Sequence, residues 1–237
     1  MSHAEHENPR QNVTFPATDA AGADHAHGYL AVPAAGRGPG VVVVQEWWGL
    51  TDHVVAIVDR LAAEGFVALA PDLYGGRTTH DAAEAMTFLR ELPPERAARD
   101  LAGAVSYLEG HEAVTSGTVG AVGFCMGGAF VLSLAAQQGG RIGAAVPWYG
   151  LPADETDFSR LTAPVLGHYG ESDASIPVEA VHATAERIRA QSGVEPELHV
   201  YPAGHAFYND ERPEAYDRAS AELAWERTTG FLRRHLS

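Results

Sequence analysis

The sequence predicts a mixed α/β fold in which a mostly parallel central sheet carries helices on both faces. Short apolar runs of strand length alternate along the chain with amphipathic segments of helical period. Some of these runs, such as the four valines at 41–44, are apolar at every position. Strands without polar alternation are typical of parallel sheets that are covered on both faces, and the repeated β-α order favours the same architecture.

The expected elements follow one another without a Gly-, Ser- or Pro-rich linker or an internal repeat. Strands are expected at 41–46, 66–70, 118–123, 142–149, 164–170 and 197–201. Helices are expected at 52–64, twice within 80–109, and at 129–138, 177–191 and 213–234. Residues 1–12 are polar and aperiodic, which predicts a flexible tail, and residues 13–237 are expected to form a single domain.

Composition and charge limit the classes of function. The 16 Lys and Arg residues against 31 Asp and Glu residues give a net charge of −15, so nucleic acid and anionic membranes are not expected as partners. The single cysteine excludes an intramolecular disulfide, and no leading segment resembles a signal peptide. No apolar run approaches the roughly 20 residues that cross a bilayer. A cytoplasmic monomer without cofactors is expected, because no segment is left over for an obligate interface.

The only cysteine lies in the stretch GFCMGG, directly after an apolar strand. Gly123 and Gly127 stand two residues before and two after Cys125, which is the small-x-nucleophile-x-small spacing of a sharp strand-to-helix turn. A thiol there would lie at a helix N-terminus, where the unpaired N–H groups favour a thiolate. A buried structural cysteine is the alternative, and this motif alone leaves the two interpretations about even.

An acid and a histidine each follow one of the last two predicted strands of the chain. Asp173 comes after the strand at 164–170, and His205 comes after the strand at 197–201. The order nucleophile, acid, histidine is that of the α/β-hydrolases, so Cys125, Asp173 and His205 form a candidate triad. When each residue is considered alone, the alternative is that Asp173 is a turn or capping residue and that His205 is a surface histidine.

The end of the valine strand carries a fourth candidate. Glu46 ends a run that is expected to be buried, and a carboxylate there is costly unless it has a partner; solvation or helix capping is the alternative. In this fold the loop after that strand supplies one oxyanion-hole N–H, and the residue after the nucleophile supplies the other. The backbones of Trp47 and Met126 are therefore the candidate donors, with simple packing as the alternative for one of the two tryptophans.

Five motifs in one order, QEWWGL, GFVALAPDLYGG, GFCMGG, GESDASIP and YPAGHAF, resemble the dienelactone hydrolase family of the α/β-hydrolase fold. The resemblance runs from about Gly28 to the last helix. It implies a hydrolase of small esters or lactones that acts through a thioester, with Cys125 as nucleophile, His205 as general base and Asp173 as its orienting acid. It also implies that Glu46 contacts the resting thiol.

The pocket departs from the members that cleave dienelactone, because no arginine follows His205 closely. Arg77 is a candidate guanidinium for a substrate carboxylate, although a surface loop is its alternative. Other candidate substrate-binding residues are aromatic: Trp48, Tyr74, Tyr149, Phe207 and Tyr208.

Three competing interpretations remain open at this point. A non-catalytic binding protein on a hydrolase scaffold and a thiol redox sensor are both compatible with the fold. Metal binding by histidines 3, 6, 25 and 27 is a weak third, because no cysteine or carboxylate completes a spaced ligand set.

Overall fold

The four valines at 41–44 lie at the centre of an eight-stranded sheet and are fully buried. The computed structural model describes residues 8–17 and 24–236. Its strands are β1 (Val13–Pro16), β2 (His25–Ala31), β3 (Gly40–Val44), β4 (Val67–Pro71), β5 (Val119–Phe124), β6 (Ile142–Trp148), β7 (Leu166–Gly170) and β8 (Glu197–Tyr201). Their order across the sheet is β1-β2-β4-β3-β5-β6-β7-β8.

The sheet is parallel from β4 to β8 and antiparallel at the other edge. β3 pairs in parallel with β4 on one side and β5 on the other, so that Val42 lies in register with Leu69 and with Ala121. β1 and β2 pair with each other, and β2 with β4, in antiparallel fashion. The predicted α/β architecture with a mostly parallel sheet is confirmed.

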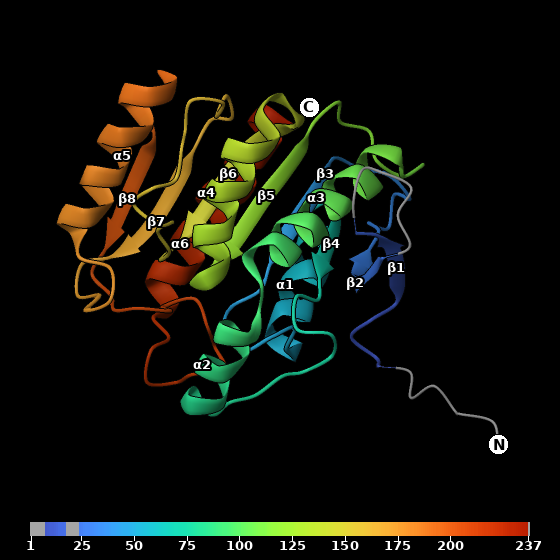
Figure 1. The fold of residues 1–237 in the computed structure, drawn as a ribbon, viewed down its shortest axis with the longest axis horizontal. Helices are drawn as coiled ribbons and strands as arrows, with labels where there is room; N and C mark the ends of the chain where they lie inside the picture. The colour runs from blue at the N-terminus through green and yellow to red at the C-terminus, as the bar shows by residue number, and fades with distance from the viewer. Residues whose placement is uncertain (1–7, 18–23, 237) are drawn as a thin grey trace.

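Helices cover both faces of this sheet (Figure 1). They are α1 (Asp52–Ala63), α2 (Ala82–Glu91), α3 (Pro94–Gly110), α4 (Met126–Gln138), α5 (Val178–Ser192) and α6 (Arg218–His235), with a short 3₁₀ turn at Gly139–Arg141. Alternate valines of β3 point to opposite faces. Val41 and Val43 pack in the core beneath α1 and α6, whereas Val42 and Val44 pack beneath α3 and α4.

Two helices begin at positions other than the predicted ones. α4 begins at Met126, directly after Cys125, because the strand turns into the helix within one residue. α6 begins at Arg218 rather than near 213, because the Asp217 side chain accepts a hydrogen bond from the Ser220 N–H and so caps the helix there. The residues at 206–217 form turns instead, and these turns lie beside the site described below.

Part of the predicted N-terminal tail is bonded to the start of α1 and to the residue after β4. Arg10 forms an ion pair with Asp52 at 2.7 Å, and the Gln11 side chain donates to Asp72 at 2.6 Å. Residues 1–7, and with them two of the histidines considered for metal binding, lie outside the described residues. Within the described part of the chain, no helix is long and apolar enough to cross a membrane.

Candidate active site

Five polar side chains follow the carboxyl ends of neighbouring parallel strands, where ligands bind in open α/β sheets. Each strand end contributes one of them. They are Glu46 after β3, Cys125 after β5, Tyr149 after β6, Asp173 after β7 and His205 after β8.

Cys125 sits on a sharp turn with a strained backbone. Its φ of 55° and ψ of −116° are unusual for a residue with a side chain, and it stands between β5 and α4 as the N-cap position of the helix. The thiol is partly exposed. This geometry presents the sulfur at the sheet edge, while Phe124 and the two flanking glycines, Gly123 and Gly127, stay buried.

The glycines around Cys125 are required by close backbone contacts. A Cβ on Gly123 would lie 2.2 Å from the Gly127 carbonyl oxygen, and a Cβ on Gly127 would lie 2.2 Å from the Val44 carbonyl oxygen. Both distances are far inside van der Waals contact. The small-x-Cys-x-small spacing therefore reflects the closeness of α4 to β3 and β5.

A continuous chain of hydrogen bonds joins the cysteine, the histidine and the acid. His205 Nε2 lies 3.2 Å from Cys125 Sγ, and His205 Nδ1 lies 2.6 Å from Asp173 Oδ2. The other oxygen of Asp173 accepts the N–H groups of Ser175 at 2.8 Å and Ile176 at 3.0 Å. The carboxylate is thus fixed on both oxygens and holds the imidazole toward the thiol.

The electrostatics of this chain favour a protonated histidine. Burial lowers the pKa of His205, but the hydrogen bonds and charges of Asp173 and Cys125 outweigh it and raise the pKa to about 10. Burial acts to raise the pKa of Asp173, yet its hydrogen bonds with His205, Ser175 and Ile176 bring that pKa below its usual value. The imidazole can therefore hold a proton while it is bonded to the ionised Asp173 carboxylate.

Glu46 is buried, with 2% of its surface exposed, and two side chains hold its carboxylate. Asn209 Nδ2 donates to Oε2 at 2.6 Å, and the Tyr149 hydroxyl lies 3.5 Å from Oε1. The resemblance implied a contact between Glu46 and the thiol, but in this structure the hydrogen bond of Cys125 is with His205. Burial raises the pKa of Glu46, and the charge of His53 and the hydrogen bond from Asn209 oppose that rise.

A cavity of about 510 Å³ opens over the thiol. Its wall includes Cys125, His205 and Tyr149 together with Trp47 and Met126, the two residues whose backbones are the candidate oxyanion donors. As the first residue of α4, Met126 has an N–H without an intrahelical acceptor. The remaining wall is largely apolar and is formed by Ala129, Gly150, Leu151, Ser175, Ile176 and Arg212.

Several residues predicted to bind substrate lie away from this cavity. Arg77 pairs with Glu91 at 2.7 Å and covers the ring of Phe88. Phe207 is fully buried, and Tyr208 bonds to Arg60 at 2.8 Å. Both aromatic residues point into the core because Ala206, with φ of 59°, reverses the chain directly after the histidine.

Trp48 and Tyr74 are also buried, each at a different edge of the site. Trp48 packs on Trp47, with ring centroids 4.8 Å apart, and lines a second cavity of about 340 Å³ next to the first. The Tyr74 hydroxyl lies 3.3 Å from the sulfur of Met126, beneath the turn that follows the cysteine. Of the five aromatic residues predicted to bind substrate, Tyr149 is the one that lines the cavity over the thiol.

Two residues of the site have no clear signal in the sequence. Arg212 lines the cavity although it stands seven positions beyond His205, because two consecutive turns, from Ala206 to Asn209 and from Asn209 to Arg212, bring the chain back. Asn209 is the partner that the buried Glu46 requires. The need for a partner could be predicted from burial, but its identity depends on this loop.

Comparisons with known proteins agree with the fold. The dienelactone hydrolase family profile matches residues 26–236. Protein usf of Aquifex pyrophilus is 34% identical over 218 residues, covering 89% of this chain and 94% of that protein. A relative from Escherichia coli strain K12, provisionally named carboxymethylenebutenolidase, is 35% identical over 229 residues, covering 90% of this chain and 83% of that protein.

Solved structures give the same result. A protein of Klebsiella pneumoniae, provisionally named dienelactone hydrolase, superposes with a TM-score of 0.80 at 32% identity and covers 94% of this chain and 98% of its own. A dienelactone hydrolase-like promiscuous phosphotriesterase from metagenomic libraries superposes with a TM-score of 0.83 at 28% identity and covers 96% of this chain and 98% of its own.

The sheet order, the turn after β5 and the residues at the strand ends define an α/β-hydrolase. Within that fold the chain belongs to the dienelactone hydrolase family, and it is a carboxylic ester hydrolase.

Proposed function

We propose that this enzyme hydrolyses small esters or lactones with Cys125 as its nucleophile, His205 as general base and Asp173 as the orienting acid. The observation that carries the proposal is the unbroken chain from Cys125 Sγ to His205 at 3.2 Å and from His205 to Asp173 at 2.6 Å, at the wall of a cavity of substrate size. Nucleophile, base and orienting group in direct contact are the arrangement that covalent acyl transfer needs.

Acylation begins with transfer of the thiol proton to His205 Nε2, which leaves a thiolate beside an imidazolium. The thiolate attacks the carbonyl carbon of the substrate, and the oxyanion that forms accepts the N–H groups of Met126 and Trp47. Collapse breaks the carbon–oxygen bond of the ester, and the imidazolium returns its proton to the leaving alkoxide. For a lactone the alkoxide stays attached to the acyl group.

Deacylation releases the acid from the thioester. A water molecule gives a proton to His205 as its oxygen attacks the thioester carbonyl, and the carbon–sulfur bond breaks to free the thiolate. Weakly basic leaving groups such as enolates suit a thiolate nucleophile, whereas amides with strongly basic leaving groups suit it less. Esters and enol lactones are thus the favoured substrates.

Glu46 has the proposed role of controlling the charge of Cys125. Both side chains face Tyr149, whose pKa is raised well above its usual value by burial and by the charges of Glu46 and Cys125. An ionised Glu46 disfavours a second negative charge on the sulfur, and a protonated Glu46 removes that penalty. The test is a titration of the thiol: an unchanged Cys125 pKa and unchanged turnover in Glu46→Gln are incompatible with this role.

The cavity also has a candidate anion site. Arg212 lines it, with its guanidinium over the ring of Trp48 at 5.6 Å and bonded to Glu214 at 2.8 Å. A guanidinium at the wall of a mostly apolar cavity favours substrates that carry a carboxylate. The second arginine expected for a dienelactone, Arg77, is instead engaged with Glu91.

The deciding experiment compares the wild type with Cys125→Ala and Cys125→Ser on p-nitrophenyl acetate, an enol lactone and cis-dienelactone. Loss of hydrolysis in Cys125→Ala is expected, and the preferred substrate of the wild type locates the substrate class. Equal rates in the wild type and Cys125→Ala would exclude the mechanism and favour a binding or thiol-sensing role. Family membership and the intact hydrogen-bonded chain do not favour that alternative.

A further inference from the structure

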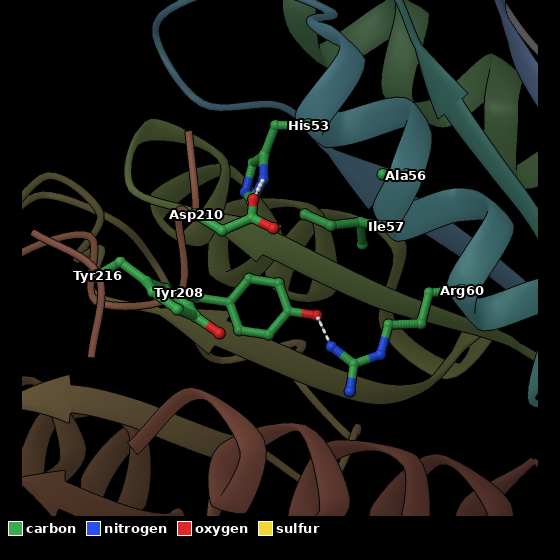
Figure 2. Close-up of a pocket in the computed structure, with 7 residues that line it drawn as sticks. All are labelled: His53, Ala56, Ile57, Arg60, Tyr208, Asp210 and Tyr216. Atoms are coloured by element: carbon green, nitrogen blue, oxygen red, sulfur yellow. Dashed lines mark hydrogen bonds and ion pairs between the residues drawn. The ribbon is translucent and has the colours of Figure 1, made fainter. Parts of the chain in front are cut away.

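A small cavity between α1 and the turns at 206–217 lies apart from the proposed active site. Its volume is about 90 Å³, and among the described residues it shares no lining residue with the cavity over Cys125. Four of its lining residues belong to α1 and three to the turns after β8 (Figure 2). A cavity of this size holds a molecule of a few heavy atoms. The polar groups on its wall indicate which charges such a molecule needs.

Arg60 brings a positive charge to one side of the cavity. Its guanidinium lies over the ring of Trp225, 4.3 Å from the centroid, and donates to the Tyr208 hydroxyl at 2.8 Å. Within residues 8–17 and 24–236, no carboxylate forms an ion pair with this guanidinium. A guanidinium carries several N–H donors in a fixed fork and accepts nothing. Arg60 therefore has donors left for an anion.

The Tyr208 hydroxyl is a second donor on the same side. Tyr208 is 5% exposed, and its oxygen accepts the hydrogen bond from Arg60, so its own O–H is left to donate. In the described part of the chain this O–H has no acceptor. A buried donor without an acceptor costs free energy unless water or a ligand completes it. A carboxylate in the cavity can accept from Arg60 and Tyr208 together.

Asp210 brings a negative charge to the other side of the cavity. His53, whose side chain is 4% exposed, holds the Oδ1 atom of Asp210 at 2.9 Å through Nδ1. Oδ2 has no partner among the described residues, and Figure 2 shows this second oxygen turned away from His53 toward the side of Tyr208. The Asp210 side chain is 68% exposed, so a ligand can reach it from solvent. A free carboxylate oxygen that is held in place in this way favours an ammonium group.

We propose that this cavity binds a small amino acid, a molecule that carries one carboxylate and one ammonium group. The carboxylate accepts from Arg60 and Tyr208, and the ammonium group donates to the free oxygen of Asp210. A simple anion would be repelled by Asp210 and a simple cation by Arg60, whereas a molecule with both charges is attracted on both sides. Ala56 and Ile57 provide an apolar wall for its carbon atoms. The proposal does not depend on the mechanism at the other cavity.

A nuclear magnetic resonance titration with four probes tests this site. Glycine and β-alanine carry both charges at different spacings, whereas acetate and methylammonium carry one charge each. At least one of the two amino acids is expected to bind roughly tenfold more tightly than acetate and methylammonium, because each single-charge probe lacks one charged hydrogen bond. The bound amino acid is expected to shift the backbone amide signals of Ala56 and Asp210.

Four variants locate the bound molecule. Asp210→Asn and Arg60→Gln each remove one charge and keep a polar side chain, and each is expected to weaken amino-acid binding by roughly 10- to 100-fold. Ala56→Met fills the cavity from α1 without a change of charge and is expected to abolish binding, so it also serves if Arg60→Gln does not fold. Arg212→Gln, at the cavity over Cys125, is the matched control and is expected to bind the amino acid as the wild type does.

Three outcomes would overturn the proposal. Equal affinities for acetate and for the amino acids would show that the ammonium group is not recognised and that the cavity takes any small anion. Binding that Asp210→Asn and Ala56→Met leave unchanged would place the amino acid elsewhere on the protein. The absence of saturable binding by both glycine and β-alanine would show that water alone completes the donors of Arg60 and Tyr208.

Discussion

Asn209 donates its side-chain N–H to a carboxylate oxygen of Glu46 over 2.6 Å, across 163 positions of sequence. Both residues are buried. The backbone N–H of Glu211 in turn donates to the side-chain oxygen of Asn209 at 3.1 Å. The loop after β8, which begins with His205, is thereby tied to the end of β3. The position of the histidine and the charge of Glu46 are linked by this one side chain.

Replacement of Asn209 by aspartate should place two carboxylates in the same buried space. Because like charges at that distance cannot both ionise, the variant is expected to lose about 2–4 kcal/mol of unfolding free energy at pH 7 and to recover part of it near pH 5. Urea unfolding at the two pH values measures the effect. Asn12→Asp, at an exposed asparagine of the N-terminal segment, is the matched control, and an equal loss in both variants would contradict the prediction.

Glu46→Gln should stabilise the protein at alkaline pH while impairing catalysis. Burial raises the pKa of Glu46, so the folded protein binds that proton more tightly than the unfolded chain does. The resulting stabilisation is complete below the ordinary glutamate pKa and is lost as the pH rises through the folded-state value. The glutamine variant is therefore expected to gain stability over the wild type at pH 8 and to lose that advantage toward pH 4.

Denaturation midpoints at pH 4, 6 and 8 test this expectation. Glu171→Gln removes an exposed acid after β7 and should leave the pH dependence of stability unchanged. A stability difference between Glu46→Gln and the wild type that is the same at all three pH values would show that the carboxylate does not titrate in this range.

The strand ends could be predicted from the sequence because their signals are local. The spacing of Gly123, Cys125 and Gly127 follows from contacts within one turn, and apolar runs of strand length identify the buried strands. The contacts of the loop after His205 could not be predicted, because they depend on the positive φ of Ala206 and the turns that follow. Phe207 is a neighbour of the histidine in sequence, yet its ring points into the core.

Asp173→Asn should leave the loop intact and remove most of the activity. One oxygen can still accept the N–H groups of Ser175 and Ile176, but an amide N–H toward His205 favours the imidazole tautomer that carries its proton on Nε2. That tautomer cannot accept the thiol proton, so kcat is expected to fall by about 10³–10⁴. Asp157→Asn, an exposed aspartate that accepts the N–H of Ser159, is the control for the turn itself. A fall of less than tenfold in Asp173→Asn speaks against its orienting role.

Gly127→Ala should disrupt the turn that presents the cysteine. The added Cβ would lie 2.2 Å from the Val44 carbonyl oxygen and 2.6 Å from that of Gln45, and both are backbone atoms of the central strand end. The expected cost is about 3 kcal/mol of unfolding free energy, with loss of activity in whatever remains folded. Gly140→Ala, which meets nothing within 4 Å, is expected to stay within about 0.5 kcal/mol of the wild type. Equal stability of the two variants would mean that α4 can move away from β3 at little cost.

Arg212→Gln should weaken the binding of anionic substrates and leave that of neutral substrates unchanged. The guanidinium lines the cavity over Cys125 and is already paired with Glu214, so a substrate carboxylate has to compete with that acid. A charged hydrogen bond contributes about 1.5–3 kcal/mol, and its loss is expected to raise KM for cis-dienelactone by roughly 10- to 100-fold. KM for p-nitrophenyl acetate, which has no carboxylate, should not change.

Two matched variants locate the origin of that effect. Arg218→Gln removes an exposed arginine that pairs with Glu222 at 4.0 Å and controls for the change in net charge. Glu214→Gln frees the Arg212 guanidinium and is expected to lower KM for the anionic substrate, because the competing acid is gone. If Arg212→Gln raises KM equally for charged and neutral substrates, the guanidinium shapes the cavity wall rather than binding an anion, and substrate charge is not what this enzyme selects.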